Sequence, residues 1–239
     1  MSRRIVVLTA GLSRPSSTRL LADQLADAVS AQVSARGEAA QVEVIERFMA
    51  TLPTFRMVLR RLIDNGDIER AATLFDDLVT SWGDSPASPE AASWAEELLL
   101  QAERLEPGPR ARLEVAATHS EYAFELIAAK LDVAEQALAR AEGVGDRFTT
   151  AAAQIQVAVG LGWRNLDLDR AGALLDATRT TMLDLGAPHW AAVALELRGM
   201  LALRRLEVVA GIALLEEAAA EHRACGSSGD VAHALAFIG

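Results

Sequence analysis

The sequence is short of cysteine and of aromatic residues, and both shortages narrow what the chain can be. Cys225 is the only cysteine among 239 residues, so the chain has no internal disulfide bond and no cage of thiolates for a metal ion. A reducing, cytoplasmic location fits this usage. Aromatic residues make up 5% of the sequence, whereas hydrophobic residues in total make up 51%. The abundant alanine and leucine favour closely packed helices over a β-sandwich, because both rank high in helix propensity.

Positive charge is also scarce, and long apolar runs are missing. The formal net charge is −10 at pH 7. A nucleic-acid interface needs a basic patch, so we expect no nucleic-acid partner for this chain alone. No stretch of about 18 consecutive apolar residues occurs, so we expect no membrane span and no membrane partner. The apolar run Ile5 to Leu8, behind a basic start, is too short for a secretory signal.

A repeated pattern of residues occupies positions 145–225. Gly160 and Ala171 are eleven residues apart, and Gly199 and Ala210 show the same spacing thirty-nine residues later. Two antiparallel helices of this kind cannot bury their apolar face alone, so such pairs stack side by side into a solenoid. The sequence therefore predicts two successive helical pairs here.

Helical periodicity continues on both sides of this repeat. An Asn-Gly-Asp turn precedes a helix in which Ala71 is followed, four residues later, by Phe75. The small residue lets neighbouring helices approach, and the bulky one fills the groove between them. Further helices are expected at residues 90–105, 111–129, 131–141 and 228–238. The last of these ends in mid-repeat, as expected of a truncated product or a fragment of a longer protein.

On these motifs, residues 54–239 resemble the divergent tetratricopeptide-like (TPR) repeats of large bacterial regulators and signalling ATPases. The glycine–alanine spacing is eleven residues, where that family usually has twelve. The resemblance implies a mainly α fold, a TPR-like α-solenoid of antiparallel helix pairs, whose concave face binds a peptide or protein partner. The ATPase and DNA-binding modules that accompany such arrays are missing from this sequence. The expected role is therefore a scaffold, without catalytic residues or a cofactor.

The first forty-six residues follow a different pattern. The apolar, β-branched run 5–9 predicts a buried strand, and the segment 20–35 predicts a helix that ends at Gly37. A second strand is predicted at 41–45, which completes a βαβ unit of flavodoxin-like type. The expected domains are a βαβ fragment at 1–46, a first helical pair with a linker at 47–89, and the repeat array at 90–239.

The loop after the first predicted strand carries groups that bind phosphate. Hydroxyls, a guanidinium and the free N–H groups of a helix start come together there, and these form anion sites in many proteins. The alternative is an ordinary helix start whose serine or threonine only caps the helix. The candidate residues are Ser13, Arg14, Ser16, Ser17 and Thr18.

Residues 4–23 resemble the opening of flavodoxin-like NAD(P)H-dependent FMN reductases, and the resemblance covers residues 1–46. In that family the equivalent loop holds the FMN phosphate, which implies this role for the five loop residues. An NAD(P)H-dependent FMN reductase is therefore the alternative function, and FMN is the cofactor it implies. Beyond Glu46 the further strands and the flavin-ring loop of that family are missing. Either the helices pack against the βαβ unit, or this segment is a remnant in a fusion.

Three residues near the C-terminus have the chemistry of metal ligands, namely His222, Cys225 and His233. They lie across a predicted turn, and zinc sites need three or four ligands in a defined geometry. Cys225 also fits the role of a small buried apolar residue. The sequence alone therefore predicts no metal site.

Overall fold

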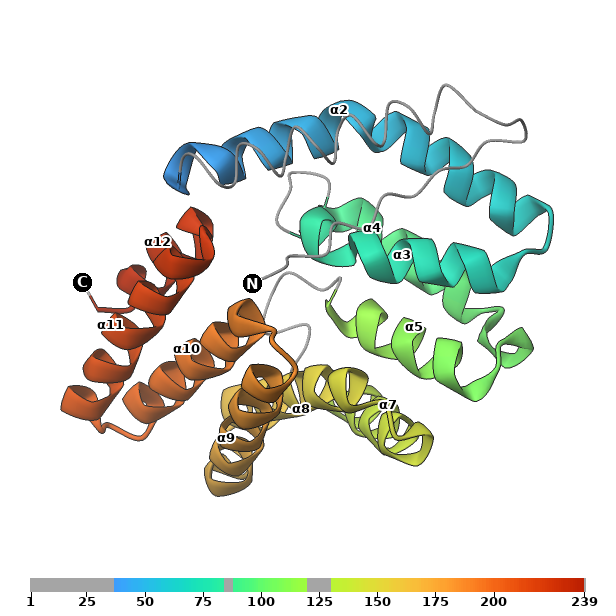
Figure 1. The fold of residues 1–239 in the computed structure, drawn as a ribbon. Helices are drawn as coiled ribbons and strands as arrows, with labels where there is room; N and C mark the ends of the chain where they lie inside the picture. Colours follow the sequence, from blue (N-terminus) through green and yellow to red (C-terminus); the bar gives the residue numbers. More distant parts are fainter. Residues whose placement is uncertain (1–36, 84–87, 120–129, 239) are drawn as a thin grey trace.

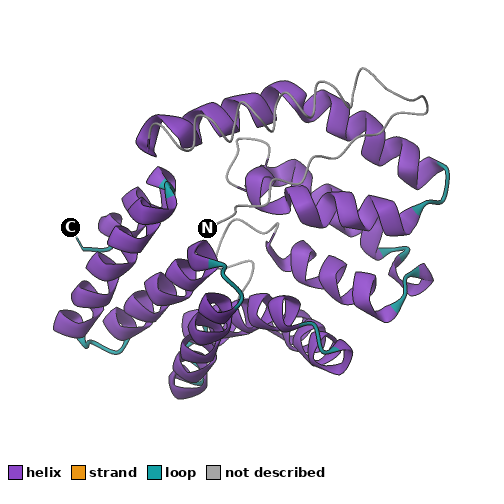
Figure 2. Ribbon diagram, in the orientation of Figure 1, coloured by secondary structure: helices purple, strands orange, loops and turns teal. Residues whose placement is uncertain are grey.

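The computed structural model describes residues 37–83, 88–119 and 130–238, and within these ranges every long element is a helix (Figures 1 and 2). The mainly α fold is therefore confirmed. The helices are α2 (Gly37–Asp64), α3 (Ile68–Gly83), α4 (Ser88–Leu99), a 3-10 turn η1 (Ala102–Arg104), α5 (Pro107–His119), α7 (Leu131–Val144), α8 (Arg147–Trp163), α9 (Leu168–Asp184), α10 (Pro188–Arg204), α11 (Val208–Cys225) and α12 (Ser228–Ala236).

The strand predicted at 41–45 is wrong, because these residues lie inside α2. Gly37 is the first described residue of this helix. Further along α2, Phe48, Leu52 and Leu59 are buried at helical spacing. This long amphipathic pattern overrides the short alternation of valine and glutamate at 41–45. The predicted strand at 5–9 and helix at 20–35 lie outside the described residues, so no βαβ unit is seen in the part that the structure describes.

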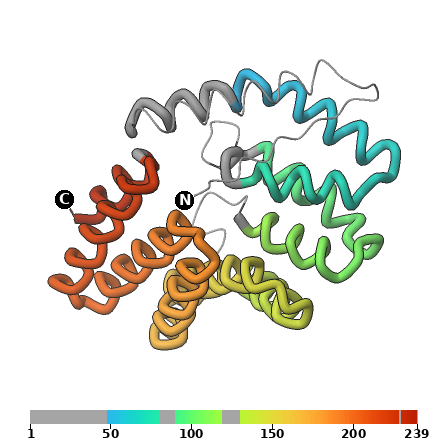
Figure 3. The backbone as a smooth tube through the Cα atoms, in the orientation of Figure 1, coloured from blue at the N-terminus to red at the C-terminus, as the bar shows by residue number. Residues whose placement is uncertain are grey.

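The helices from α7 to α12 pack each against the next in chain order, in a curved row (Figures 1 and 3). The two helical pairs predicted at 145–225 are confirmed as α8 with α9 and α10 with α11. At the end of the row α12 contacts α2, so the last helix of the chain meets the first described one (Figure 1).

Five of the described turns between helices share one hydrogen-bond pattern. Between α9 and α10 the N–H of Gly186 donates to Leu183 O at 3.0 Å, and that of Ala187 donates to Met182 O at 2.8 Å. This is the Schellman arrangement, which needs a left-handed residue after the helix. The same pair of bonds closes α2, α8, α10 and α11. The left-handed residues are Gly66, Asn165, Gly186, Leu206 and Gly226, with φ from 52° to 78°.

Two clusters of buried apolar side chains fill the stack. The cluster of α2 to α5 contains Phe48 and Phe75, with Trp94 half-buried at its edge. Ala71 and Phe75, the small and bulky residues noted in the sequence, are both fully buried in it. In the cluster of α7 to α11, the fully buried side chains that the structure describes are all aliphatic, with alanine the commonest.

The glycines of the sequence repeat mark close helix contacts, but with different neighbours. A Cβ on Gly199 would lie 3.1 Å from the backbone N of Leu215 and 3.2 Å from the carbonyl of Gly211, so α10 and α11 touch through their backbones. A Cβ on Gly160 would instead meet the side chain of Leu131 in α7. Glycine is thus required at both positions for close approach, to a partner helix in one case and to the preceding helix in the other.

Ion pairs join the second helices of successive pairs. Arg170 of α9 donates to Glu135 of α7 at 2.6 Å, and Arg179 of α9 forms an ion pair with Glu221 of α11 at 2.7 Å. Because these groups are partly exposed, each pair adds at most about 1 kcal/mol. Their main effect is to fix the register of one helical pair against the next.

Candidate functional site

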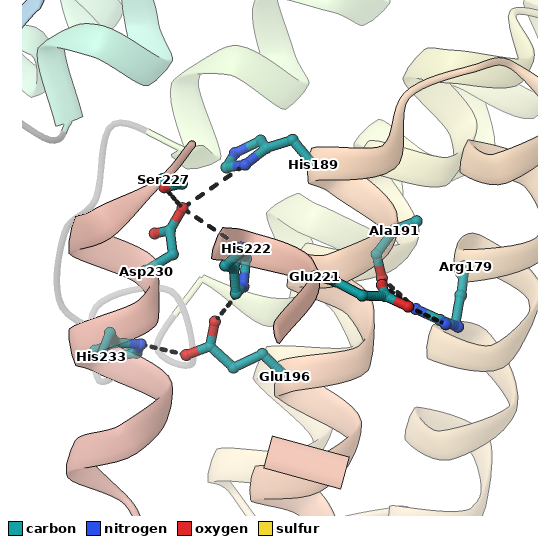
Figure 4. Close-up of polar contacts among 9 residues, drawn as sticks. All are labelled: Arg179, His189, Ala191, Glu196, Glu221, His222, Ser227, Asp230 and His233. Carbon is teal, nitrogen blue, oxygen red and sulfur yellow. Dashed lines mark hydrogen bonds and ion pairs between the residues drawn. The ribbon is translucent and has the colours of Figure 1, made fainter. Parts of the chain in front are cut away.

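The five loop residues predicted to bind phosphate, Ser13, Arg14, Ser16, Ser17 and Thr18, lie outside the described residues. The polar groups that the structure does bring together lie elsewhere, where α10, α11 and α12 meet (Figure 4). We call this the α10–α12 cluster, made of His189, Glu196, His222, Asp230 and His233.

Glu196 of α10 is the centre of the α10–α12 cluster. Its Oε2 lies 2.9 Å from Nε2 of His222, and its Oε1 is hydrogen-bonded to Nδ1 of His233 (Figure 4). His222 is fully buried, and Glu196 is only 5% exposed. A buried carboxylate therefore has one imidazole partner on each oxygen, which meets the requirement that buried charges be paired.

The local sequence explains how His222 becomes buried. On α11 the residues Leu215, Ala218, Ala219 and His222 are all buried. Their spacing places them on one face of the helix, which packs against α10. Gly226, left-handed with φ 78°, then reverses the chain into α12, which carries Asp230 and His233 back over this face.

The hydrogen bonds of the α10–α12 cluster decide the charge of Glu196. Burial alone would raise the pKa of this carboxyl, but the hydrogen bonds from His222 and His233 hold it below the usual value. The hydrogen bond to Glu196 likewise raises the pKa of His233 against the effect of burial. Glu196 is therefore an anion and the natural acceptor for a proton on Nε2 of His222.

Nε2 of His222 faces Glu196, and the other ring nitrogen, Nδ1, faces Asp230. This atom is buried and has no hydrogen-bond partner. It lies 3.7 Å from Oδ2 of Asp230, and Nδ1 of His189 lies 3.7 Å from the same oxygen. One ligand atom from each of the three residues lies within 4.8 Å of the other two. Ser227 donates its hydroxyl hydrogen bond to this carboxylate oxygen as well.

In the structure His222 lies beside His189 and Asp230, whereas its neighbours of ligand chemistry in the sequence are Cys225 and His233. The repeat itself held the missing signal. His189 and Asp230 stand at the starts of α10 and α12, forty-one residues apart, which is close to one repeat. Residues one repeat apart lie on neighbouring stacked helices. His222, at the end of the helix between them, completes the group.

A second feature lies on the surface, at the turns after α8 and α10. Arg204 donates to the carbonyls of Gly162 and Trp163, both at 3.0 Å, and its guanidinium lies 5.3 Å from the Trp163 ring centroid. These bonds hold the two turns together beside a small apolar hollow, which is lined by Ala158, Val159, Gly162, Trp163, Leu175, Leu197, Leu201 and Arg204. Leu166, Leu206 and Val209 are 57%, 85% and 85% exposed next to it in the chain. We call this feature the turn surface.

No protein-family model matches the chain, and no curated protein matches its sequence. Of the helices that the structure describes, none is long and apolar enough to cross a membrane. The functional proposals below therefore rest on the sequence pattern and on the geometry of the described residues.

Proposed function

We propose that the protein is a non-enzymatic scaffold, a TPR-like α-solenoid that binds an extended peptide segment of a protein partner. The observation that carries the proposal is the turn surface, where an apolar hollow is lined by two stacked helical pairs and the turns that follow α8 and α10 expose apolar side chains. Stacked helical pairs are used in many proteins as extended binding surfaces.

The burial of α8 and α10 leaves the turn surface as the accessible part of these two helical pairs. Most residues of α8 and of α10 are buried, so the sides of these helices offer little area. The turns that follow them instead expose Leu166, Leu206 and Val209. Exposed apolar side chains and an apolar hollow with a charged residue at its border are typical of a protein-binding site. Arg204 supplies such a border, and its guanidinium covers one face of Trp163.

The alternative of an FMN reductase loses support from the fold. A flavodoxin-like unit needs the parallel strand predicted at 41–45, and these residues belong to α2. A phosphate loop without its neighbouring strand has no sheet edge on which to present the cofactor. We therefore base the proposal on the helical repeats alone.

The experiment selects binding peptides from a random library on the immobilised full chain and measures their affinity by fluorescence anisotropy. The variant Leu166→Gln/Val209→Gln removes two apolar contacts and is expected to weaken binding at least about tenfold, since each buried apolar side chain contributes on the order of 1.5–3 kcal/mol. The matched control is Met57→Gln on α2, which changes another exposed apolar side chain, 64% exposed, far along the chain.

Retained affinity in Met57→Gln with loss in the double variant supports the proposal. Two results contradict it. One is that no peptide binds saturably, and the other is that the two variants weaken binding equally, which indicates non-specific adhesion to apolar residues.

A further inference from the structure

One buried polar atom of the α10–α12 cluster has no hydrogen-bond partner within the protein. Nδ1 of His222 is buried without a partner, and it faces the Asp230 carboxylate at 3.7 Å. This distance is too long for a hydrogen bond, which needs about 2.7–3.2 Å between the heavy atoms. His189 presents its own Nδ1 to the same oxygen at the same distance.

The electrostatics of this arrangement call for a cation. In the tautomer of His222 that donates from Nε2 to the Glu196 carboxylate, Nδ1 carries the lone pair with which an imidazole binds a metal ion. This Nδ1 lies 3.7 Å from a carboxylate oxygen of Asp230 (Figure 4). Leaving a buried polar atom unsatisfied costs about 1–3 kcal/mol. A positive ion between the three atoms would satisfy both nitrogens and the carboxylate together.

We propose that His189, His222 and Asp230 form a binding site for one divalent transition-metal ion of the zinc type. Two imidazole nitrogens and one carboxylate oxygen are ligands that zinc accepts, whereas magnesium and calcium prefer oxygen alone. Neighbouring ligands of a tetrahedral zinc ion lie about 3.3–3.4 Å apart when the bonds are near 2.0–2.1 Å. The two nitrogen–oxygen distances of 3.7 Å therefore need to shorten only slightly.

The surroundings of the three ligands resemble those of known metal sites. Metal-binding histidines usually donate their other ring N–H to a carboxylate, which fixes the tautomer and strengthens the ligand. The Glu196 carboxylate is placed to accept this hydrogen bond from Nε2 of His222. Burial lowers the pKa of His189, although Asp230 opposes the shift.

Exposure of the ligands leaves a route for the ion and room for a fourth ligand. The side chain of His222 is fully buried, whereas those of His189 and Asp230 are 36% and 30% exposed. The open side of the site therefore faces solvent, where a water molecule completes the coordination. Because the ligands come from α10, α11 and α12, the ion ties the last helix to the stack.

The test is isothermal titration of the full chain, first freed of metal with a chelator, with zinc ions alone. We expect one saturable site per chain, together with a rise in Tm on adding zinc. The variants His189→Gln and Asp230→Asn each remove a half-exposed ligand and are expected to weaken zinc binding at least about tenfold, the loss typical when a metal site is damaged. The control is Glu217→Gln, which changes a 57% exposed carboxylate of α11 outside the α10–α12 cluster and is expected to keep the affinity within about threefold.

Each result decides the proposal. Zinc binding and a rise in Tm that are lost in both ligand variants and kept in the control support it. No saturable binding at millimolar zinc overturns it. Equal binding by all variants, or binding of magnesium as tight as that of zinc, also overturns it, since both results mean attraction to the acidic surface and not to these imidazoles.

Discussion

The helices α2 to α5 and the helices α7 to α12 solve the same packing problem in different ways. The first group buries two aromatic rings, Phe48 and Phe75, among its leucine and alanine side chains, and Phe75 is fully buried. The second group brings its helices so close that glycine backbones touch, as at Gly199 and Gly211. Large side chains tolerate irregular helix spacing, whereas backbone contact enforces one spacing. The regular, glycine-marked half is also the half in which the sequence repeat is clearest.

The strongest test of the aromatic half is Phe75→Ala. This substitution removes a fully buried ring from α3 and leaves a cavity, so we expect a loss of about 3–5 kcal/mol in the free energy of unfolding. Urea denaturation followed by circular dichroism measures it. Phe148→Ala is the control, because this ring is 41% exposed and its removal costs much less. Equal losses in the two variants would contradict the assignment of Phe75 to the core.

The corresponding test of the glycine half is Gly199→Ala. Alanine gains about 1 kcal/mol in helix propensity, but its methyl group would press on the backbone of α11, and overpacking of this kind costs about 1–3 kcal/mol. We expect a net loss of about 1–2 kcal/mol in urea unfolding.

Gly143→Ala is the matched control for this test. A Cβ at this helical position would meet nothing within 4 Å, so the same substitution is expected to add about 0.5–1 kcal/mol. If Gly199→Ala were as stabilising as Gly143→Ala, the helices α10 and α11 could not touch through their backbones.

A charge at the junction of the two halves provides a test by pH. Burial raises the pKa of Asp76 on α3 to about 6, and the nearby carboxylates of Asp77 and Asp146 add to the shift against the opposing Arg112. Asp146 caps α8, so this group feels both halves of the molecule. Because the folded-state pKa exceeds the usual 3.8, the folded protein binds the proton more tightly. Protonation of Asp76 therefore stabilises the folded protein increasingly as the pH falls from about 6 towards 4. Above pH 6 the buried carboxylate is charged, and its full destabilising effect is present.

We expect Asp76→Asn to raise the free energy of unfolding at pH 7 by about 1–2 kcal/mol and to reduce its pH dependence between pH 4 and 6. Urea denaturation across this range measures both effects. Asp77→Asn, at an exposed neighbouring position, is the control and should change stability less. A stability curve for Asp76→Asn that parallels the unsubstituted protein would refute the role given to this carboxyl.

The smallest expected effect concerns the turns. Leu206 occupies the left-handed position after α10 with φ 65°, where the turn after α2 has Gly66. A left-handed leucine costs about 1–2 kcal/mol, and its side chain is 85% exposed, so Leu206→Gly is expected to stabilise the protein by about 1 kcal/mol. Gly186→Leu makes the reverse change in the preceding turn, after α9, and should destabilise by a similar amount. Opposite changes in the free energy of guanidinium unfolding are expected for the two variants, and changes of the same sign would show that left-handed leucine carries no cost in these turns.

The sequence predicted most of the described fold because helical periodicity dominates it. Gly199, and Ala71 with Phe75, marked real helix contacts, since small and bulky residues at fixed spacing reflect packing directly. Ala210 did not, because it is exposed and Gly199 approaches Gly211 and Leu215 instead. The strand at 41–45 failed because five residues of alternation carry less information than the long helix around them. The grouping of His189 with His222 and Asp230 could not come from local spacing, as it depends on how neighbouring repeats stack.

The most direct test of the proposed zinc site in the α10–α12 cluster is an X-ray diffraction experiment on crystals of the full chain grown with zinc, with data collected at the zinc absorption edge. We expect one anomalous peak enclosed by α10, α11 and α12, within about 2.0–2.2 Å of Nδ1 of His189, Nδ1 of His222 and a carboxylate oxygen of Asp230. A map without a peak there, or with peaks only at exposed surface carboxylates, would contradict it.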